Sequence, residues 1–87
     1  MYQVRLLQPA IHDLQRLDKP TAVRITERLK WLAENFASVI PKRLTGQLAG
    51  LCKLREGDYR IIYQVLHREK TIIVQSIGHR RDIYKKR

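Results

Sequence analysis

The sequence predicts an α+β domain in which two helices pack on a mostly antiparallel sheet, in the order β-α-α-β-β-β with a short C-terminal helical tail. Three observations support this fold class. The chain has 87 residues, enough for one small core and too few for two. Apolar residues recur at helical spacing in the N-terminal half, and strand-like alternating or β-branched segments flank this region. We therefore expect one domain over residues 1–87.

The N-terminal half is expected to hold one strand and two helices. Residues 2–7 alternate apolar and polar side chains, as in a half-buried strand. A first helix is predicted from Pro9 to the Asp18-Lys19-Pro20 break, because proline fits the first turn of a helix. A longer second helix is predicted from Pro20 to a point before Pro41. Its apolar stripe consists of Ala22, Ile25, Leu29, Leu32 and Phe36.

The C-terminal half is expected to form a meander of three strands. Segments 51–55 and 59–66 flank Gly57-Asp58, a sequence that favours a two-residue hairpin turn. After a second tight turn, residues 71–77 are rich in Ile and Val and predict a further strand, which Gly78 is expected to end.

The predicted hairpin register separates the side chains by chemistry. With a Gly57-Asp58 loop, Arg55 lies opposite Arg60 and Lys53 opposite Ile62. The face expected to pack on the helices carries Cys52, Leu54, Tyr59, Ile61, Tyr63 and Val65. The other face carries Lys53, Arg55 and Arg60, a like-charge cluster that water or an anion must relieve. The alternative interpretation is an ordinary solvated sheet face.

The charge balance points to a polyanionic partner. The chain has 18 Lys and Arg against 8 Asp and Glu, a formal net charge of +10, so nucleic acid is the first candidate. Cys52 is the single cysteine, which excludes an intrachain disulfide and favours a buried structural thiol. No stretch predicts a membrane span or a signal peptide. We expect a cytoplasmic protein with no metal and no small-molecule cofactor.

The residues after the last predicted strand supply candidate groups for chemistry on RNA. His79 and Arg80 are expected near Arg60, where Lys53 and Tyr84 would complete a phosphate-binding concavity with groups able to transfer protons. Further phosphate contacts are expected from Arg55, Arg81, Lys85, Lys86 and Arg87.

Three segments resemble the RelE/ParE toxin superfamily. They are Arg43-Leu44-Thr45-Gly46, the stretch 51–63 with its Lys-Leu-Arg and Gly-Asp-Tyr-Arg motifs, and the stretch 77–84 with Gly-His-Arg. The predicted element order matches this superfamily as well. The resemblance implies a helix-on-sheet toxin that an antitoxin neutralises. In the RelE branch it implies a metal-independent nuclease that cleaves messenger RNA in the ribosomal A site, and in the ParE branch a gyrase poison.

The RelE branch depends on basic and proton-transfer groups that the resemblance places at Lys53, Arg60, Arg80 and Tyr84. Leu51 departs from the pattern, because a well-known member has a second lysine there. Cleavage at the 2′-hydroxyl needs a base, cations on the phosphate and an acid at the leaving oxygen. Arg60 and Arg80 suit the phosphate charge. Lys53, His79 and Tyr84 are the candidates for proton transfer, with no unique assignment.

One further surface stands apart from the predicted basic face. Trp31 is expected on the side of the second helix that carries Arg24 and Arg28, either as a docking site for an acidic antitoxin helix or covered by another segment. Three functions remain open on the sequence. They are a ribosome-dependent endoribonuclease, a ParE-like gyrase inhibitor without nuclease activity, and a plain basic nucleic-acid-binding module.

Overall fold

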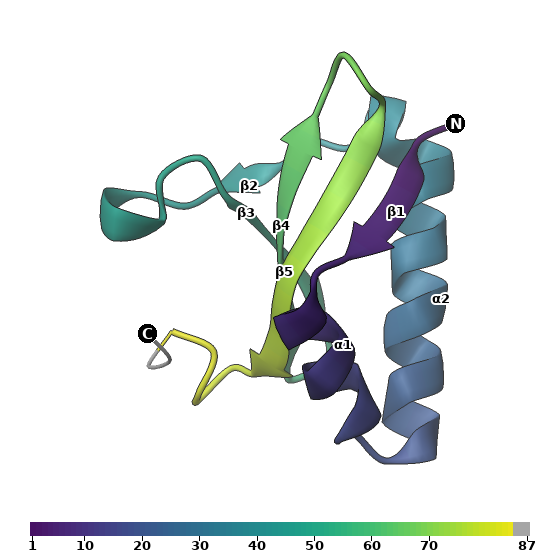
Figure 1. Ribbon diagram of the computed structural model, residues 1–87, viewed down its shortest axis with the longest axis vertical. Coiled ribbons are helices and arrows are strands. Elements are labelled where there is room, and N and C mark those ends of the chain that lie inside the picture. Colours follow the sequence, from purple (N-terminus) through teal and green to yellow (C-terminus); the bar gives the residue numbers. More distant parts are fainter. Residues whose placement is uncertain (85–87) are drawn as a thin grey trace.

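The computed structural model describes residues 1–84 as a five-stranded sheet with two helices on one side (Figure 1). The helices are α1 (Gln8–Gln15) and α2 (Lys19–Asn35). The strands are β1 (Gln3–Leu6), β2 (Lys42–Arg43), β3 (Cys52–Glu56), β4 (Tyr59–Leu66) and β5 (Thr71–His79). The sheet order is β1-β5-β4-β3-β2, with β1 parallel to β5 and the other neighbours antiparallel. The predicted fold class is confirmed.

Local sequence explains both helices. The Asp18 carboxylate caps α2 by accepting hydrogen bonds from the Thr21 backbone N–H (3.3 Å) and the Thr21 hydroxyl (2.8 Å). A proline lies in the first turn of each helix, where its missing N–H costs no hydrogen bond. The predicted stripe of α2 packs into the core, and its buried members are Ile25, Leu29, Leu32 and, just beyond the helix, Phe36.

The predicted β3–β4 hairpin has the expected register. Arg55 pairs with Arg60, Lys53 with Ile62, and Glu56 with Tyr59 across the two-residue turn. Gly57 has a φ of +60°, which suits the glycine-first pattern of a type II′ hairpin turn. Lys53, Arg55 and Arg60 therefore share the face of the sheet turned away from the helices, called the outer face below.

A β-bulge in β5 was not predicted. Tyr63 pairs with Val74 while Ile62 pairs with Ser76, so Gln75 is an extra residue in β5. Val74 and Ile77 can therefore both point into the core, where both are buried. Everything after the bulge is shifted by one residue relative to regular pairing, which reverses the face that each side chain occupies.

In the far half of β5, a side chain of α1 and not a neighbouring strand accepts a hydrogen bond from the free backbone edge. The β1–β5 pairing covers Thr71–Val74, and beyond it the Asp13 carboxylate of α1 accepts a hydrogen bond of 2.8 Å from Ile77 N–H. Asp13 is buried, with 5% of its surface exposed. This contact fixes α1 to the part of β5 that leads into the C-terminal segment.

Three details differ from the sequence prediction. The short strand β2 was not predicted, and β5 continues through Gly78 to His79 instead of ending at Gly78. Residues 80–84 form a turn in which the His79 C=O accepts hydrogen bonds from Asp82 N–H (2.8 Å) and Ile83 N–H (3.0 Å), and they do not form a regular tail helix. Within the described residues, neither helix is long and apolar enough to cross a membrane.

Candidate functional site

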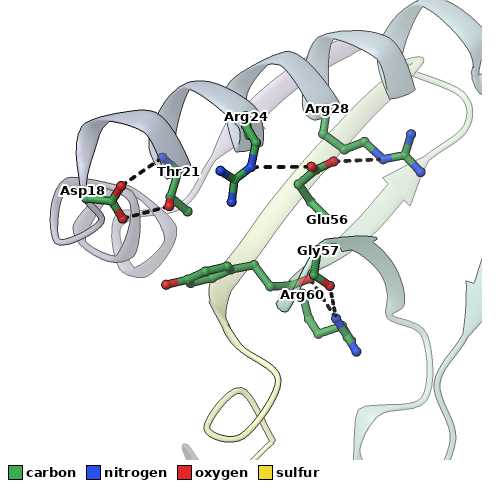
Figure 2. Close-up of polar contacts among 8 residues, drawn as sticks. Asp18, Thr21, Arg24, Arg28, Glu56, Gly57 and Arg60 are labelled. Carbon is green, nitrogen blue, oxygen red and sulfur yellow. Dashed lines mark hydrogen bonds and ion pairs between the residues drawn. The ribbon is translucent and has the colours of Figure 1, made fainter.

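The Gly57-Asp58 turn organises the basic end of the outer face. Arg60 is only 8% exposed, and its Nη1 donates to the carbonyl oxygens of Gly57 (3.1 Å) and Tyr59 (3.0 Å), as Figure 2 shows for Gly57. These two carbonyls relieve the crowding between Arg60 and its register partner Arg55. The sequence predicted the crowding, whereas the acceptors that relieve it come from the turn itself.

Arg80 is held by the same turn. Its backbone N–H donates to the Asp58 carbonyl (2.8 Å), and its Nε lies 3.8 Å from the Asp58 carboxylate. Both side chains are more than half exposed, so this ion pair is weak and its carboxylate can be replaced by another anion. The structure thus brings Arg60 and Arg80 to adjacent residues of one turn, as the sequence predicted.

Lys53 lies on the outer face with Arg60, and Tyr84 reaches that face through the C-terminal turn. Ile83 packs against Gly78, the register partner of Arg60, and is buried. A Cβ on Gly78 would lie 3.1 Å from Ile83 Cδ1, so glycine permits this contact. The exposed Tyr84 ring then borders a hollow whose lining includes Leu48, Leu51, Ile62, Gln75 and Ser76.

His79 does not join this group on the outer face. The bulge places it opposite Tyr59 on the face that carries the helices, with ring centroids 5.6 Å apart in an edge-to-face arrangement. It borders a cavity formed with Asp13, Arg16 and Leu17 of the α1 region. Its Nδ1 accepts a hydrogen bond from Arg81 N–H (3.1 Å), which fixes the ring against the start of the C-terminal turn. The structure therefore brings His79 next to the register partner of Arg60 but not onto the face that carries Lys53 and Arg60.

Two of the remaining predicted phosphate contacts lie among the described residues. Arg55 and Arg81 are exposed. Lys85, Lys86 and Arg87 lie outside the described residues. Within residues 1–84, no cluster of three or more His, Cys, Asp or Glu side chains is placed to hold a metal ion.

The Cys52 thiol belongs to the core and not to the candidate site. Burial is the main cause that raises its pKa, and the side chain is only 8% exposed. Burial also raises the pKa of the neighbouring Tyr63 hydroxyl to about 12, and contact with Cys52 adds to that shift. Both groups are held in their neutral forms, which suits packing rather than nucleophilic chemistry.

The arginines predicted to dock an antitoxin are engaged within the monomer. Arg24 Nε and Arg28 Nε each lie 3.8 Å from the Glu56 carboxylate, so they join α2 to the end of β3 (Figure 2). Arg28 also lies over the Trp31 ring, 4.5 Å from its centroid. Trp31 is 41% exposed, so no other segment covers it fully. Sequence reasoning missed Glu56, because its two partners lie on the preceding helix and far from it in the chain.

Comparison with known proteins identifies the family. A model of the ParE toxin of type II toxin–antitoxin systems, parDE, matches residues 4–84. The chain belongs to the ParE toxin family, within the RelE/ParE superfamily. It is a toxin of the type II toxin–antitoxin class.

Relatives of this family member carry RelE-type names. Toxin RelG of Mycobacterium tuberculosis is 28% identical over 85 residues, which are 98% of each chain. A putative RelE-like toxin protein of Escherichia coli is 30% identical over 90 aligned positions, covering 95% of this chain and 90% of the relative. The toxin–antitoxin complex RelBE2 of M. tuberculosis contains a chain with a TM-score of 0.81 and 28% identity, with 90% of this chain and 96% of that chain covered.

Proposed function

We propose that this toxin is a ribosome-dependent, metal-independent endoribonuclease that cleaves messenger RNA in the A site and thereby inhibits translation in the cytoplasm. The observation that carries the proposal is the attachment of Arg60 and Arg80 to one hairpin turn, at the end of the sheet whose outer face carries Arg60 and Lys53. The RelE-type names of its relatives support the same reading.

The reaction requires charge compensation at one phosphate. The 2′-oxygen bonds to phosphorus while the bond from phosphorus to the 5′-oxygen breaks, leaving a 2′,3′-cyclic phosphate and a 5′-hydroxyl. Arg80 is the group that contacts the phosphate. Its guanidinium is paired only weakly with the exposed Asp58 carboxylate, so a phosphate can replace that carboxylate. Arg60 is too buried for extensive contact, and it supports the turn while adding positive potential.

The proton transfers need a base at the 2′-hydroxyl and an acid at the 5′-oxygen. Lys53 and Tyr84 are favoured because both reach the outer face, whereas His79 lies on the opposite face. His79 instead positions the C-terminal turn through its hydrogen bond from Arg81 N–H. Leu51 makes the neighbouring hollow apolar where a second lysine would add charge, so we expect slow cleavage relative to a lysine-bearing toxin.

The partner that neutralises the toxin is a cognate antitoxin. A formal net charge of +10 favours an acidic partner, and the structural relative from M. tuberculosis is a toxin–antitoxin complex. Arg55, Arg81 and the basic residues 85–87 would attract ribosomal or messenger RNA when the antitoxin is absent.

A second candidate function is gyrase inhibition without nuclease activity. The observation that favours it is the description of the matching family model as a ParE toxin. On this alternative the outer face has no catalytic task, and neither Tyr84 nor Lys53 is required for toxicity.

Primer extension on messenger RNA in a cell-free translation system tests the proposal. Wild-type protein is compared with Arg80→Ala and with Arg68→Ala, a matched charge loss in the exposed turn at the other end of β4. Reactions without ribosomes and a gyrase supercoiling assay run in parallel. We expect cuts only with ribosomes, lost in Arg80→Ala and kept in Arg68→Ala. Intact message with blocked supercoiling would instead establish gyrase inhibition.

A further inference from the structure

The β-bulge places two consecutive polar side chains on the same face of β5. In a regular strand, neighbouring side chains point to opposite faces, so only one of two consecutive residues reaches the outer face. Ser76 pairs with Ile62, which lies on the outer face of β4. Gln75 is the extra residue of the bulge, and its Nε2 donates a hydrogen bond of 3.5 Å to Oε1 of Gln64, the next outer-face residue of β4. Gln75 and Ser76 therefore both lie on the outer face.

These two side chains border the hollow next to Tyr84. The hollow has a volume of about 380 Å³, which is within the range of small-molecule sites. Leu48 and Leu51 contribute apolar lining from the loop before β3, and the C-terminal turn contributes the Tyr84 ring. This loop (teal) and the C-terminal turn (yellow) both lie on the side of the sheet away from α2 (Figure 1). The hollow thus combines apolar walls, an aromatic ring, an amide and a hydroxyl.

The polar groups of the hollow decide what can occupy it. A side-chain amide offers N–H donors and a carbonyl acceptor in one plane, and the hydrogen bond to Gln64 occupies a single N–H of Gln75. An apolar ligand would leave the buried amide groups unpaired, which costs roughly 1–3 kcal/mol. A nucleobase has a face that stacks on an aromatic ring and an edge that pairs with an amide. Adenine is the base that a glutamine amide pairs with through two hydrogen bonds.

The hollow lies beside the cations of the outer face. Ser76 and Lys53 lie in one row across the sheet, because both pair with Ile62. Gly78, the register partner of Arg60, lies two residues further along β5, a distance of about 7 Å at the usual rise of a strand. One nucleotide can span this separation. Its base can therefore enter the hollow while its phosphate lies at the basic end of the outer face.

We propose that the hollow is a nucleobase subsite in which Gln75 and Ser76 select adenine in single-stranded RNA. The Gln75 amide donates to a ring nitrogen of the base and accepts from its exocyclic amino group. The Ser76 hydroxyl lies beside the amide and bonds the same edge, and Gln64 holds the amide in place. RNA as the ligand rests on the proposed function, whereas the choice of base is an additional property of the bulge.

NMR on the uniformly 15N-labelled full chain tests the base preference with RNA that cannot be cleaved. The probes are trinucleotides of adenine, cytosine or uracil in which every 2′-hydroxyl is methylated, so no 2′-oxygen can attack. We expect the side-chain amide signals of Gln75 and Gln64 to shift with the adenine probe. The adenine probe should bind about tenfold more tightly than the uracil probe, equivalent to roughly 1.4 kcal/mol.

Three variants separate base recognition from stacking and charge. Gln75→Leu removes both hydrogen-bonding groups and should lower affinity for the adenine probe about tenfold, while affinity for the uracil probe changes less than about twofold. Ser76→Ala, a smaller change beside it, should lower adenine affinity about threefold. Gln15→Leu makes the first change on the exposed end of α1 and should leave every affinity within about twofold. Amide spectra and the exchange of Ile77 N–H report whether the bulge is retained.

Several results would overturn the inference. They are equal affinity for the three probes, shifts that leave the Gln75 side chain unaffected, an equal loss for all probes in Gln75→Leu, or no binding up to millimolar RNA. The measurement needs neither ribosomes nor cleavage. A toxin that prefers the adenine probe but leaves message intact would refute the nuclease proposal alone. A nuclease without adenine preference in binding would refute the subsite alone.

Discussion

Replacing Asp13 tests how α1 holds the far half of β5. The carboxylate accepts a buried hydrogen bond of 2.8 Å from Ile77 N–H, and Asp13→Ala leaves this N–H without its acceptor. A hydrogen bond to a charged group contributes roughly 1.5–3 kcal/mol, and an unpaired buried donor costs roughly 1–3 kcal/mol. We therefore expect a loss of about 3 kcal/mol in the free energy of unfolding. For a domain of this size that lowers the Tm by roughly 12–24 °C.

Urea denaturation followed by circular dichroism measures the loss, and hydrogen exchange reports the Ile77 amide directly. Asp13→Asn keeps an oxygen that can accept from Ile77 N–H, so we expect it to lose less than half as much. Glu34→Ala, an exposed position on α2, should leave stability within about 0.5 kcal/mol. The ion pair of Asp13 with the exposed Arg16 contributes little. Equal losses in Asp13→Asn and Asp13→Ala would refute the hydrogen-bond argument, because both variants remove the charge.

Three other perturbations follow from the structure. Burial raises the pKa of Tyr63 from 10 to about 12, so the free energy of unfolding should fall by up to about 3 kcal/mol as pH rises from 10 to 12. Tyr63→Phe should flatten this part of a stability profile measured by urea denaturation. An unchanged slope in the variant would count against the burial of the Tyr63 hydroxyl as the cause. Gly78→Ala should be tolerated because Ile83 Cδ1 can move, whereas the branched side chain of Gly78→Val should displace Ile83. The valine variant should therefore be cut faster in limited proteolysis and cause weaker growth arrest than the alanine variant. A larger effect of alanine than of valine would contradict this packing. Hydrogen bonds from Thr21 lower the pKa of Asp18, so this carboxylate stabilises the fold above its ordinary pKa near 3.8 and loses that contribution as pH falls. Asp18→Asn should therefore make the helix content less dependent on acid. An acid titration identical to that of the wild type would argue against the cap.

The elements that the sequence predicted well are those with local causes. The apolar stripe of α2 and the Gly57-Asp58 turn each lie within a short segment, and the two-residue loop alone fixes which β3 residue faces which β4 residue. That register correctly placed Lys53, Arg55 and Arg60 on one face. Local signals were sufficient because neither prediction needed information from a distant part of the chain.

The misplaced His79 has a non-local cause. The bulge at Gln75 inserts one residue without a glycine or proline to mark it, and it forms because Val74 and Ile77 both pack inward. A one-residue insertion moves every later side chain to the other face. Nothing in the sequence indicated that the Asp13 carboxylate would accept a hydrogen bond from Ile77 N–H, because the two residues are 64 positions apart. Long-range partners of this kind decide which predicted site residues meet.

The parallel pairing of β1 with β5 sets the order in which the chain can fold. Gln3 pairs with Thr71, so the first strand finds its neighbour only after the last strand has formed. β5 also lies against β4, and without it both β1 and β4 would expose unpaired edges. Contacts this distant in sequence slow folding, since a long loop must close before they form. Arg80 follows β5, so its attachment to the Gly57-Asp58 turn also forms only after the last strand is in place.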